Sequence, residues 1–123
     1  GLCDVAPYLL TKLSKFTQDA NYAETAAVTS LKLTAKSTAK KGSITVKWTV
    51  KGDASVADGY QVWKSTKQSK GYKKAITTTK KSYKNTKGLK KGTRYYYKVR
   101  AYKVVDGKNV YSDWSNKAYR VAK

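Results

Sequence analysis

The sequence predicts an all-β sandwich, in which two antiparallel sheets face each other across one core. From Leu31 onward, short segments of alternating apolar and polar residues follow one another, separated by Gly, Ser, Asn, Asp and pairs of lysines. The longest segment, Arg94 to Val104, alternates without interruption, and Asp106-Gly107 after it is a strong hairpin signal. The chain has 123 residues, which is enough for one domain with a sizeable core.

The stretch from Leu89 to Tyr102 is the clearest strand signal, because it joins a turn to a long two-residue alternation. One face of the predicted strand carries Tyr95, Tyr97, Val99 and Ala101. The other face carries Tyr96, Lys98, Arg100 and Tyr102. Such alternation is typical of a strand with one buried face. We therefore expect the first set to lie in the core and the second set to point outward.

Leu89, Gly92 and Tyr95 form a corner ahead of this strand. Gly92 supplies the bend. A tyrosine two residues after Thr93 resembles the tyrosine corner of Greek-key sandwiches, where the tyrosine hydroxyl bonds back to the backbone of the preceding corner. The resemblance implies a structural role for Tyr95.

Six further segments complete a predicted set of seven strands. In two of them, Trp48 and Tyr60 share a face with other apolar residues, so we expect both rings to point inward. Asp58-Gly59 turns the chain into the segment that begins at Tyr60. The six segments are Leu31–Ala35, Ile44–Val50, Tyr60–Lys64, Tyr72–Thr77, Ser82–Asn85 and a last strand from Tyr111 or Lys117 to Val121. The residues to which we assign structural roles are Trp48, Tyr60, Leu89, Gly92, Tyr95 and Tyr97.

The composition changes near residues 27–30, since residues 1–28 carry two lysines and three acids whereas the rest carries 25 basic residues and four acids. We therefore divide the chain into an N-terminal extension, residues 1–29, and a domain, residues 30–123. Apolar residues at helical spacing after Pro7 predict a short helix from about Tyr8 to Thr17. Its apolar stripe needs a partner, either an end of the sandwich or a neighbouring domain.

Cys3 is the only cysteine of the chain. It is either a lipid-acceptor residue or an unpaired cysteine that belongs to upstream sequence. Leu2 disfavours lipidation, because a small residue is expected before such a site. No secretion signal precedes the fold, and we interpret the sequence as a mature or trimmed piece of a longer protein.

The composition argues against catalysis and metal binding. Histidine is absent and only one cysteine is present, which excludes zinc fingers, Cys-His nucleophiles and internal disulfides. The seven acidic residues are scattered, with no pair at the spacing of a calcium loop or a glycosidase site. We therefore expect a non-enzymatic protein without cofactors or metals. No apolar run reaches membrane-spanning length.

The net charge of +20 comes almost entirely from lysine, since only Arg94, Arg100 and Arg120 are arginines. Arginine is the residue suited to bidentate recognition of phosphates and bases, so we expect no specific nucleic-acid partner. Lysine pairs occur at predicted turns and strand ends, where they favour solubility and discourage edge-to-edge pairing. A dedicated polyanion-binding surface is the alternative interpretation, although lysines spread around the domain dilute any one patch.

Four segments recur in a characteristic order: Ile44-Thr-Val-Lys-Trp48, Gly59-Tyr-Gln-Val62, Leu89-x-x-Gly-Thr-x-Tyr95-x-Tyr-x-Val-x-Ala101 and Ser112-Asp-Trp-Ser115. Together they resemble a fibronectin type III domain over about residues 30–123. The resemblance implies an immunoglobulin-like sandwich with sheets of three and four strands and Trp48 between them. It is strongest to lysine-rich and tyrosine-rich versions that serve as accessory modules in secreted or cell-surface proteins of Gram-positive bacteria. Residues 105–109 contain no Arg-Gly-Asp, so integrin binding does not carry over.

The segment Tyr111-Ser-Asp-Trp-Ser115 is similar to the Trp-Ser-x-Trp-Ser box of cytokine-receptor members, with Tyr in place of the first Trp. In those members, aromatic rings interleave with cations of the preceding strand. The resemblance implies that Lys98 and Arg100 stack with Tyr111 and Trp114, each contact contributing about 0.5–1 kcal/mol at an exposed site. We interpret this arrangement as structural, with recognition as the alternative.

Two functions stay open at this point. The first is a non-catalytic, monomeric accessory module that acts as a spacer and as a protein or cell-wall interaction domain, in contact with neighbouring domains of the same protein. The second is a module that binds polysaccharides or polyanions, with rings stacked on sugars and lysines near anionic groups such as those of cell-wall polymers. The candidate binding residues are Trp63, Tyr96, Lys98, Arg100, Tyr102, Tyr111 and Trp114. For Trp63, ordinary cross-strand packing is the alternative.

Single-stranded nucleic acid is a third and weaker candidate partner. Basic and aromatic residues interleave from Tyr95 to Tyr102, as they do in stacking platforms for single strands. The βαββαβ order of an RNA-recognition domain is absent from the predicted elements.

Overall fold

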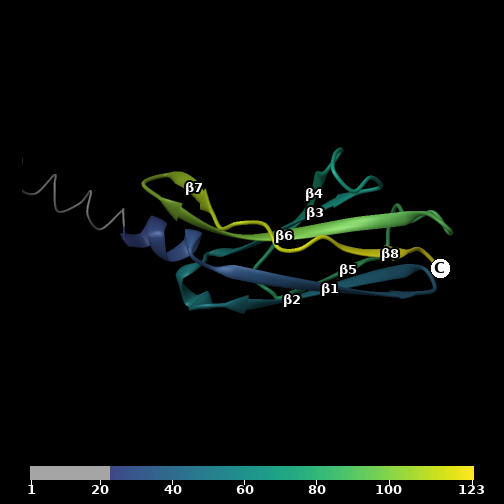
Figure 1. Ribbon diagram of the computed structural model, residues 1–123, viewed down its shortest axis with the longest axis horizontal. Coiled ribbons are helices and arrows are strands. Elements are labelled where there is room, and N and C mark those ends of the chain that lie inside the picture. The colour runs from purple at the N-terminus through teal and green to yellow at the C-terminus, as the bar shows by residue number, and fades with distance from the viewer. Residues whose placement is uncertain (1–22) are drawn as a thin grey trace, which may run out of the picture.

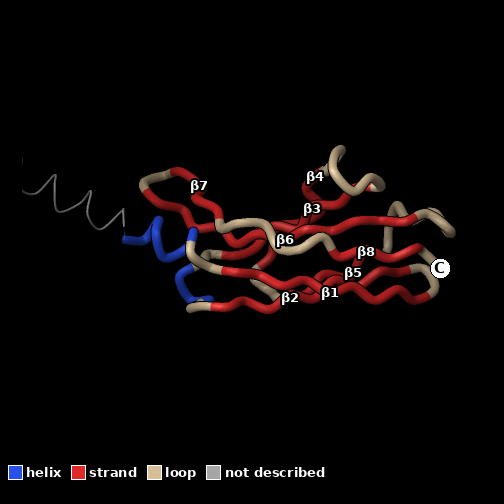
Figure 2. Tube along the Cα trace, in the orientation of Figure 1, coloured by secondary structure: helices blue, strands red, loops and turns tan. Residues whose placement is uncertain are grey.

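The computed structural model describes residues 23–123, which form two antiparallel β-sheets packed face to face (Figure 1). This confirms the predicted all-β sandwich. Residues 23–29 form a helical segment, drawn in blue in Figure 2. The side chains of Val28, in this segment, and of Leu31, just after it, are buried in the core. The predicted helix over residues 8–17 and Cys3 lie outside the described residues. Within residues 23–123, no helix is long and apolar enough to cross a membrane.

The two sheets contain three and five strands. The first sheet has the order β1-β2-β5, and the second has the order β4-β3-β6-β7, with β8 also paired to β6. A single 3₁₀ turn, Ala54–Val56, lies between β2 and β3. The strands are β1 Lys32–Lys40, β2 Ser43–Lys51, β3 Gly59–Ser65, β4 Lys73–Thr78, β5 Ser82–Asn85, β6 Arg94–Val105, β7 Lys108–Tyr111 and β8 Ala118–Val121.

The last strand was predicted to run from Tyr111 or Lys117 to Val121. The structure has β8 at the later of these two starts and an additional strand, β7, that ends at Tyr111, so the described chain has eight strands and not seven. Serine hydroxyls explain the interruption. The hydroxyl of Ser112 accepts a hydrogen bond from the Ala101 N–H, and that of Ser115 accepts one from the Val99 N–H, each at 2.9 Å. The N–H groups of the same serines donate to the Ala101 and Val99 carbonyls at 3.0 and 2.8 Å. The segment 112–117 thus satisfies the edge of β6 without being a strand.

The core lies between the inward faces of the two sheets. The inward residues of β6, from Tyr95 to Ala101, are buried, as the alternation predicted. Trp48 of β2 packs edge to face on Tyr60 of β3, with ring centroids 5.7 Å apart. The Tyr97 side chain is completely buried, and its hydroxyl accepts a hydrogen bond of 2.8 Å from the side-chain amide of Asn85. This bond links β6 of one sheet to β5 of the other.

The corner ahead of β6 has the geometry expected of a tyrosine corner. The Tyr95 hydroxyl accepts a hydrogen bond from the Lys90 N–H at 2.6 Å and donates one to the Gly88 carbonyl at 3.3 Å. Leu89 packs against the core, and Gly92 has φ of +85°, a conformation that glycine adopts without strain. These residues hold the loop against the start of β6.

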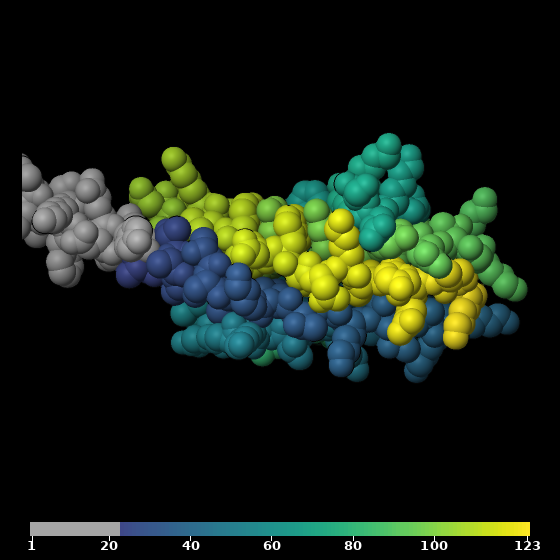
Figure 3. Space-filling view, viewed as in Figure 1, coloured from purple at the N-terminus to yellow at the C-terminus, as the bar shows by residue number. Residues whose placement is uncertain are grey.

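One lateral side of the sandwich is closed by hydrogen bonds between β1 and the C-terminal segment. The side-chain amide of Asn116 accepts from the Ala35 N–H at 2.8 Å and donates to the Ala35 carbonyl at 2.9 Å. Ser37 donates to the Tyr119 carbonyl, and Arg120 donates to the Ser37 carbonyl. The C-terminal segment, yellow in Figure 3, lies directly against β1, in blue. On the opposite side, no hydrogen bond joins β4 to β5 within the described residues.

Ser115→Ala is expected to lower the free energy of unfolding by about 1–3 kcal/mol, because it leaves the buried Val99 N–H without its hydroxyl acceptor. Urea unfolding measures the loss. Ser82→Ala is the matched control, since Ser82 is an exposed strand residue. Equal losses in the two variants would show that the Ser115 hydroxyl does not replace a strand partner.

Burial raises the pKa of Tyr97 to about 12, from its ordinary value of 10.0. Between these two pH values the unfolded chain loses the phenol proton and the folded chain keeps it, so the free energy of unfolding falls as the pH rises. The full loss is about 2–3 kcal/mol. The stability difference between the natural chain and Tyr97→Phe, measured by urea unfolding, is expected to shrink from pH 9 to pH 12. A constant difference would contradict the assignment.

Candidate functional site

The outward face of β6 carries a row of alternating cations and aromatic rings, which we call the ladder. Lys98 and Arg100 of β6 supply the cations. The rings come from both sides of the strand: from β3, from the residue before β4, from the end of β7 and from the segment 112–117. The ladder consists of Tyr111, Arg100, Trp114, Lys98, Tyr72 and Trp63.

Arg100 lies among three rings. Its guanidinium carbon is 3.6 Å from the ring centroid of Tyr111, 4.4 Å from that of Trp114 and 5.4 Å from that of Trp63. Burial lowers the pKa of Arg100, although the guanidinium stays protonated at any physiological pH. Its Nε donates a 3.1 Å hydrogen bond to Gln61, whose side-chain oxygen also accepts from the Trp63 indole at 3.2 Å.

Lys98 continues the ladder toward the other end of β6. Its Nζ lies 4.1 Å from the ring centroid of Trp114 and 4.4 Å from that of Tyr72. Burial lowers the pKa of Lys98, and the positive charges of Lys117 and Arg100 lower it further. Trp63 meets Trp114 edge to face, with ring centroids 5.8 Å apart. The electron-rich faces of these rings are therefore engaged by cations of the same chain.

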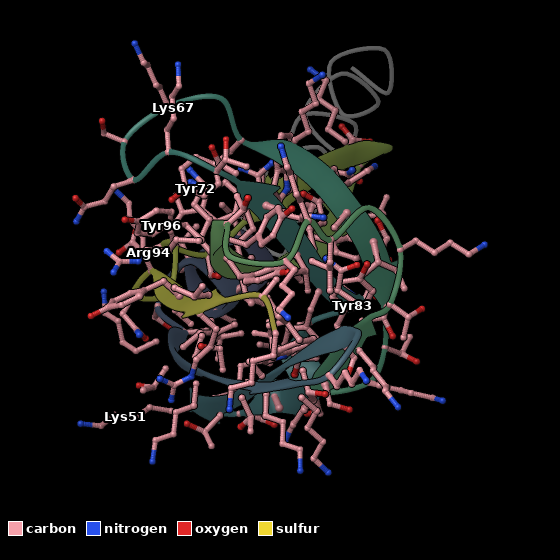
Figure 4. All side chains as sticks on the ribbon, turned by 90° about the vertical axis from the view of Figure 1, so that its right-hand side faces the viewer. Lys51, Lys67, Tyr72, Tyr83, Arg94 and Tyr96 are labelled. Atoms are coloured by element: carbon pink, nitrogen blue, oxygen red, sulfur yellow. The ribbon has the colours of Figure 1, made fainter. Side chains whose placement is uncertain are left out.

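The structure brings together five of the seven candidate binding residues: Trp63, Lys98, Arg100, Tyr111 and Trp114. Tyr96 belongs to a neighbouring group, because its ring packs 5.7 Å from that of Tyr119, which in turn lies under Arg94. Figure 4 shows Tyr72, Tyr96 and Arg94 one below the other on one side of the sandwich. Tyr102 pairs with Tyr111 across the strands, and its ring lies close to Gly59.

Two members of this site are absent from the sequence-based set. Gln61 lies directly opposite Arg100 in the strand register. Its position between the inward residues Tyr60 and Val62 indicates that it points outward, toward the ladder, and this could have been predicted from the sequence. Although Gln61 is on the outward face of the sheet, it is almost completely buried, because the side chains of Trp63 and Arg100 cover it. Tyr72 lies at the end of the loop before β4, and sequence alternation alone does not show that this loop folds back over Lys98.

The fold agrees with the comparison to known families. The family model for the fibronectin type III domain matches residues 26–117. The chain belongs to the fibronectin type III domain family. No curated protein sequence matches the chain.

Three similar solved structures illustrate the range of the fold. A Fn3-like protein from Clostridium thermocellum is 28% identical, with a TM-score of 0.54, over 74% of this chain and 88% of that one. A fibronectin type III domain of a human protein is 16% identical, with a TM-score of 0.63, over 85% and 80%. A β-1,2-glucanase from Parabacteroides distasonis is 22% identical, with a TM-score of 0.60, over 77% of this chain but only 13% of that chain.

Trp114→Ala is expected to lower the free energy of unfolding by about 1–3 kcal/mol, since it removes two cation–π contacts and one edge-to-face aromatic contact. Thermal and urea unfolding measure the loss. Val104→Ala, on an exposed residue of the same strand, is the control and should change stability by less than about 0.5 kcal/mol. An unchanged melting temperature for Trp114→Ala would show that the ladder does not brace the sheet.

Proposed function

We propose that this chain is a non-catalytic accessory module of an extracellular or cell-surface protein, and that it acts mainly as a stiff spacer between neighbouring domains. The observation that carries the proposal is the ladder. The residues best suited to bind a ligand on the outer sheet face are instead bound to one another, through contacts of 3.6–4.4 Å between Arg100 or Lys98 and the nearest rings. Such contacts stiffen a sheet whether or not a ligand is present.

The shape of the described chain supports the spacer role. The helical segment 23–29 and the C-terminus lie at opposite ends of the long axis of the sandwich (Figure 1). Domains joined at these two ends would be held apart by the length of the sandwich. A fold of this kind also occupies 13% of the length of a glucanase, which is consistent with a module within a larger protein.

Binding of polysaccharide through the outward aromatics is the alternative function for the same face. A sugar that stacks on Trp114 competes with both Lys98 and Arg100 for its ring, since these cations lie 4.1 and 4.4 Å from the centroid. The lost cation–π contacts would offset much of the stacking energy. We therefore assign the ladder to the stability of the sheet.

The proposal is tested in the parent protein with three forms: the natural chain, a flexible Gly/Ser linker in place of residues 23–123, and an unrelated β-sandwich of similar length in that place. If the domain is a spacer, the linker form keeps its turnover of small soluble substrates but loses activity on, or attachment to, the cell surface. The unrelated sandwich restores the lost property, because it restores the distance.

Two results would contradict the proposal. One is failure of the unrelated sandwich to restore the property while the natural domain does so, which would indicate a specific contact. The other is hydrolysis of a polysaccharide by the purified chain alone, measured as new reducing ends, which would indicate a catalytic domain.

A further inference from the structure

A cleft of about 520 Å³ opens between the two sheets on the side where β4 and β5 are not bonded to each other. The label of Tyr83 marks this side in Figure 4, opposite to the side that carries Tyr96 and Arg94. The residues that matter for its chemistry are Lys64, Lys73, Lys74, Lys87, Tyr83 and Asn85. None of the residues that line the cleft is acidic. The volume lies within the range of about 300–1,000 Å³ that is typical of small-molecule sites.

Lys64 is the unusual residue of this cleft, because it occupies a core-facing position of β3. Tyr60 and Val62, at the two preceding positions of the same face, are buried in the core. Lys64 continues the alternation, is half-buried, and pairs with the core residue Tyr97 in the strand register. Its Nζ lies 4.7 Å from the ring centroid of Tyr95. Burial lowers the pKa of Lys64, which reflects the loss of water around the ammonium group.

A second lysine faces Lys64 directly across the strands. A β-bulge after Val62 shifts the register between β3 and β4, so that Lys64 pairs with Lys73. Like charges directly opposite each other on one face destabilise a sheet. Within the described residues, no carboxylate lies within ion-pair distance of either lysine. The arrangement therefore stores an unbalanced positive charge in a concave site.

We propose that this cleft binds the carboxylate of an acidic sugar. The carboxylate lies between the ammonium groups of Lys64 and Lys73, where it relieves their repulsion and compensates for the lost hydration of Lys64. The ring of Tyr83 is in the wall, where it contacts the sugar ring. Each ammonium group donates one charge-assisted hydrogen bond to the carboxylate, so that the two lysines hold its two oxygens.

The inference goes beyond the spacer role and uses none of the ladder residues. It is tested on the isolated chain by titration, with binding followed by amide chemical shifts in NMR. The probe is a mannuronate trimer, and mannotriose of the same linkage is the matched neutral sugar, since it has a hydroxymethyl group in place of each carboxylate. The trimer is expected to shift the amides around Lys64 and Lys73, with weaker binding at high salt. Mannotriose is expected to bind at least about tenfold more weakly.

Lys64→Gln and Lys73→Gln are each expected to weaken binding of the trimer by about tenfold, the typical effect of losing one charge-assisted hydrogen bond. Lys47→Gln is the matched control, because it removes the same charge from the exposed outer face of the three-stranded sheet. It should change the affinity by less than about twofold. Lys73 is exposed, so Lys73→Gln keeps the test valid even if Lys64→Gln does not fold.

Four outcomes would overturn the inference: no binding of the trimer, equal binding of mannotriose, equal weakening by Lys47→Gln, or tighter binding of inorganic phosphate or of a glutamate peptide than of the trimer. The first three remove the carboxylate site, and the last assigns the cleft to another anion. None of them bears on the spacer experiment, which measures activity of the parent protein.

Discussion

Strand β6 packs against other residues on both of its faces and is hydrogen-bonded along both of its edges, and it positions the elements around it. Its inward residues form the centre of the core, and its outward cations are held by the aromatic rings of the ladder. One edge pairs with β3 along seven residues. The other edge pairs with β7 and β8, and between them with the hydroxyls of Ser112 and Ser115. Each neighbouring element is therefore positioned by its contact with β6.

The two faces of β6 contribute unequally to the free energy of folding. Complete burial of an aliphatic side chain such as Val99 contributes about 1.5–3 kcal/mol, and Tyr97 adds a larger buried surface. Each cation–π contact of the half-exposed ladder contributes about 0.5–1 kcal/mol. The core therefore decides the fold, whereas the ladder holds the outer face in one arrangement. A face held in this way suits the proposed spacer. The cleft beside Lys64 differs from the rest of the basic surface because its positive charge is half-buried in a concave site.

The alternation of β6 and the turn at Asp106-Gly107 were predictable, because both depend only on residues that are neighbours in the sequence. The structure confirms the turn, since both of its residues have positive φ, +51° and +74°. The division of the last strand was not predictable from period, since it depends on two hydroxyls that meet N–H groups more than ten residues away. In the ladder, the sequence indicated the two cations, Tyr111 and Trp114, but Tyr72 reaches Lys98 through the path of a loop. The pairing of Lys64 with Lys73 was not predictable either, because a β-bulge sets the register between their strands.

Amide hydrogen exchange of β6, measured by NMR, shows whether both edges of this strand are bonded. If the serine hydroxyls complete the edge of this strand, the N–H groups of Val99 and Ala101 exchange about as slowly as the amides of β6 that bond to β3, because only unfolding of the domain exposes them. Exchange of these two amides at the rate of loop residues, with slow exchange retained on the β3 side, would contradict the account.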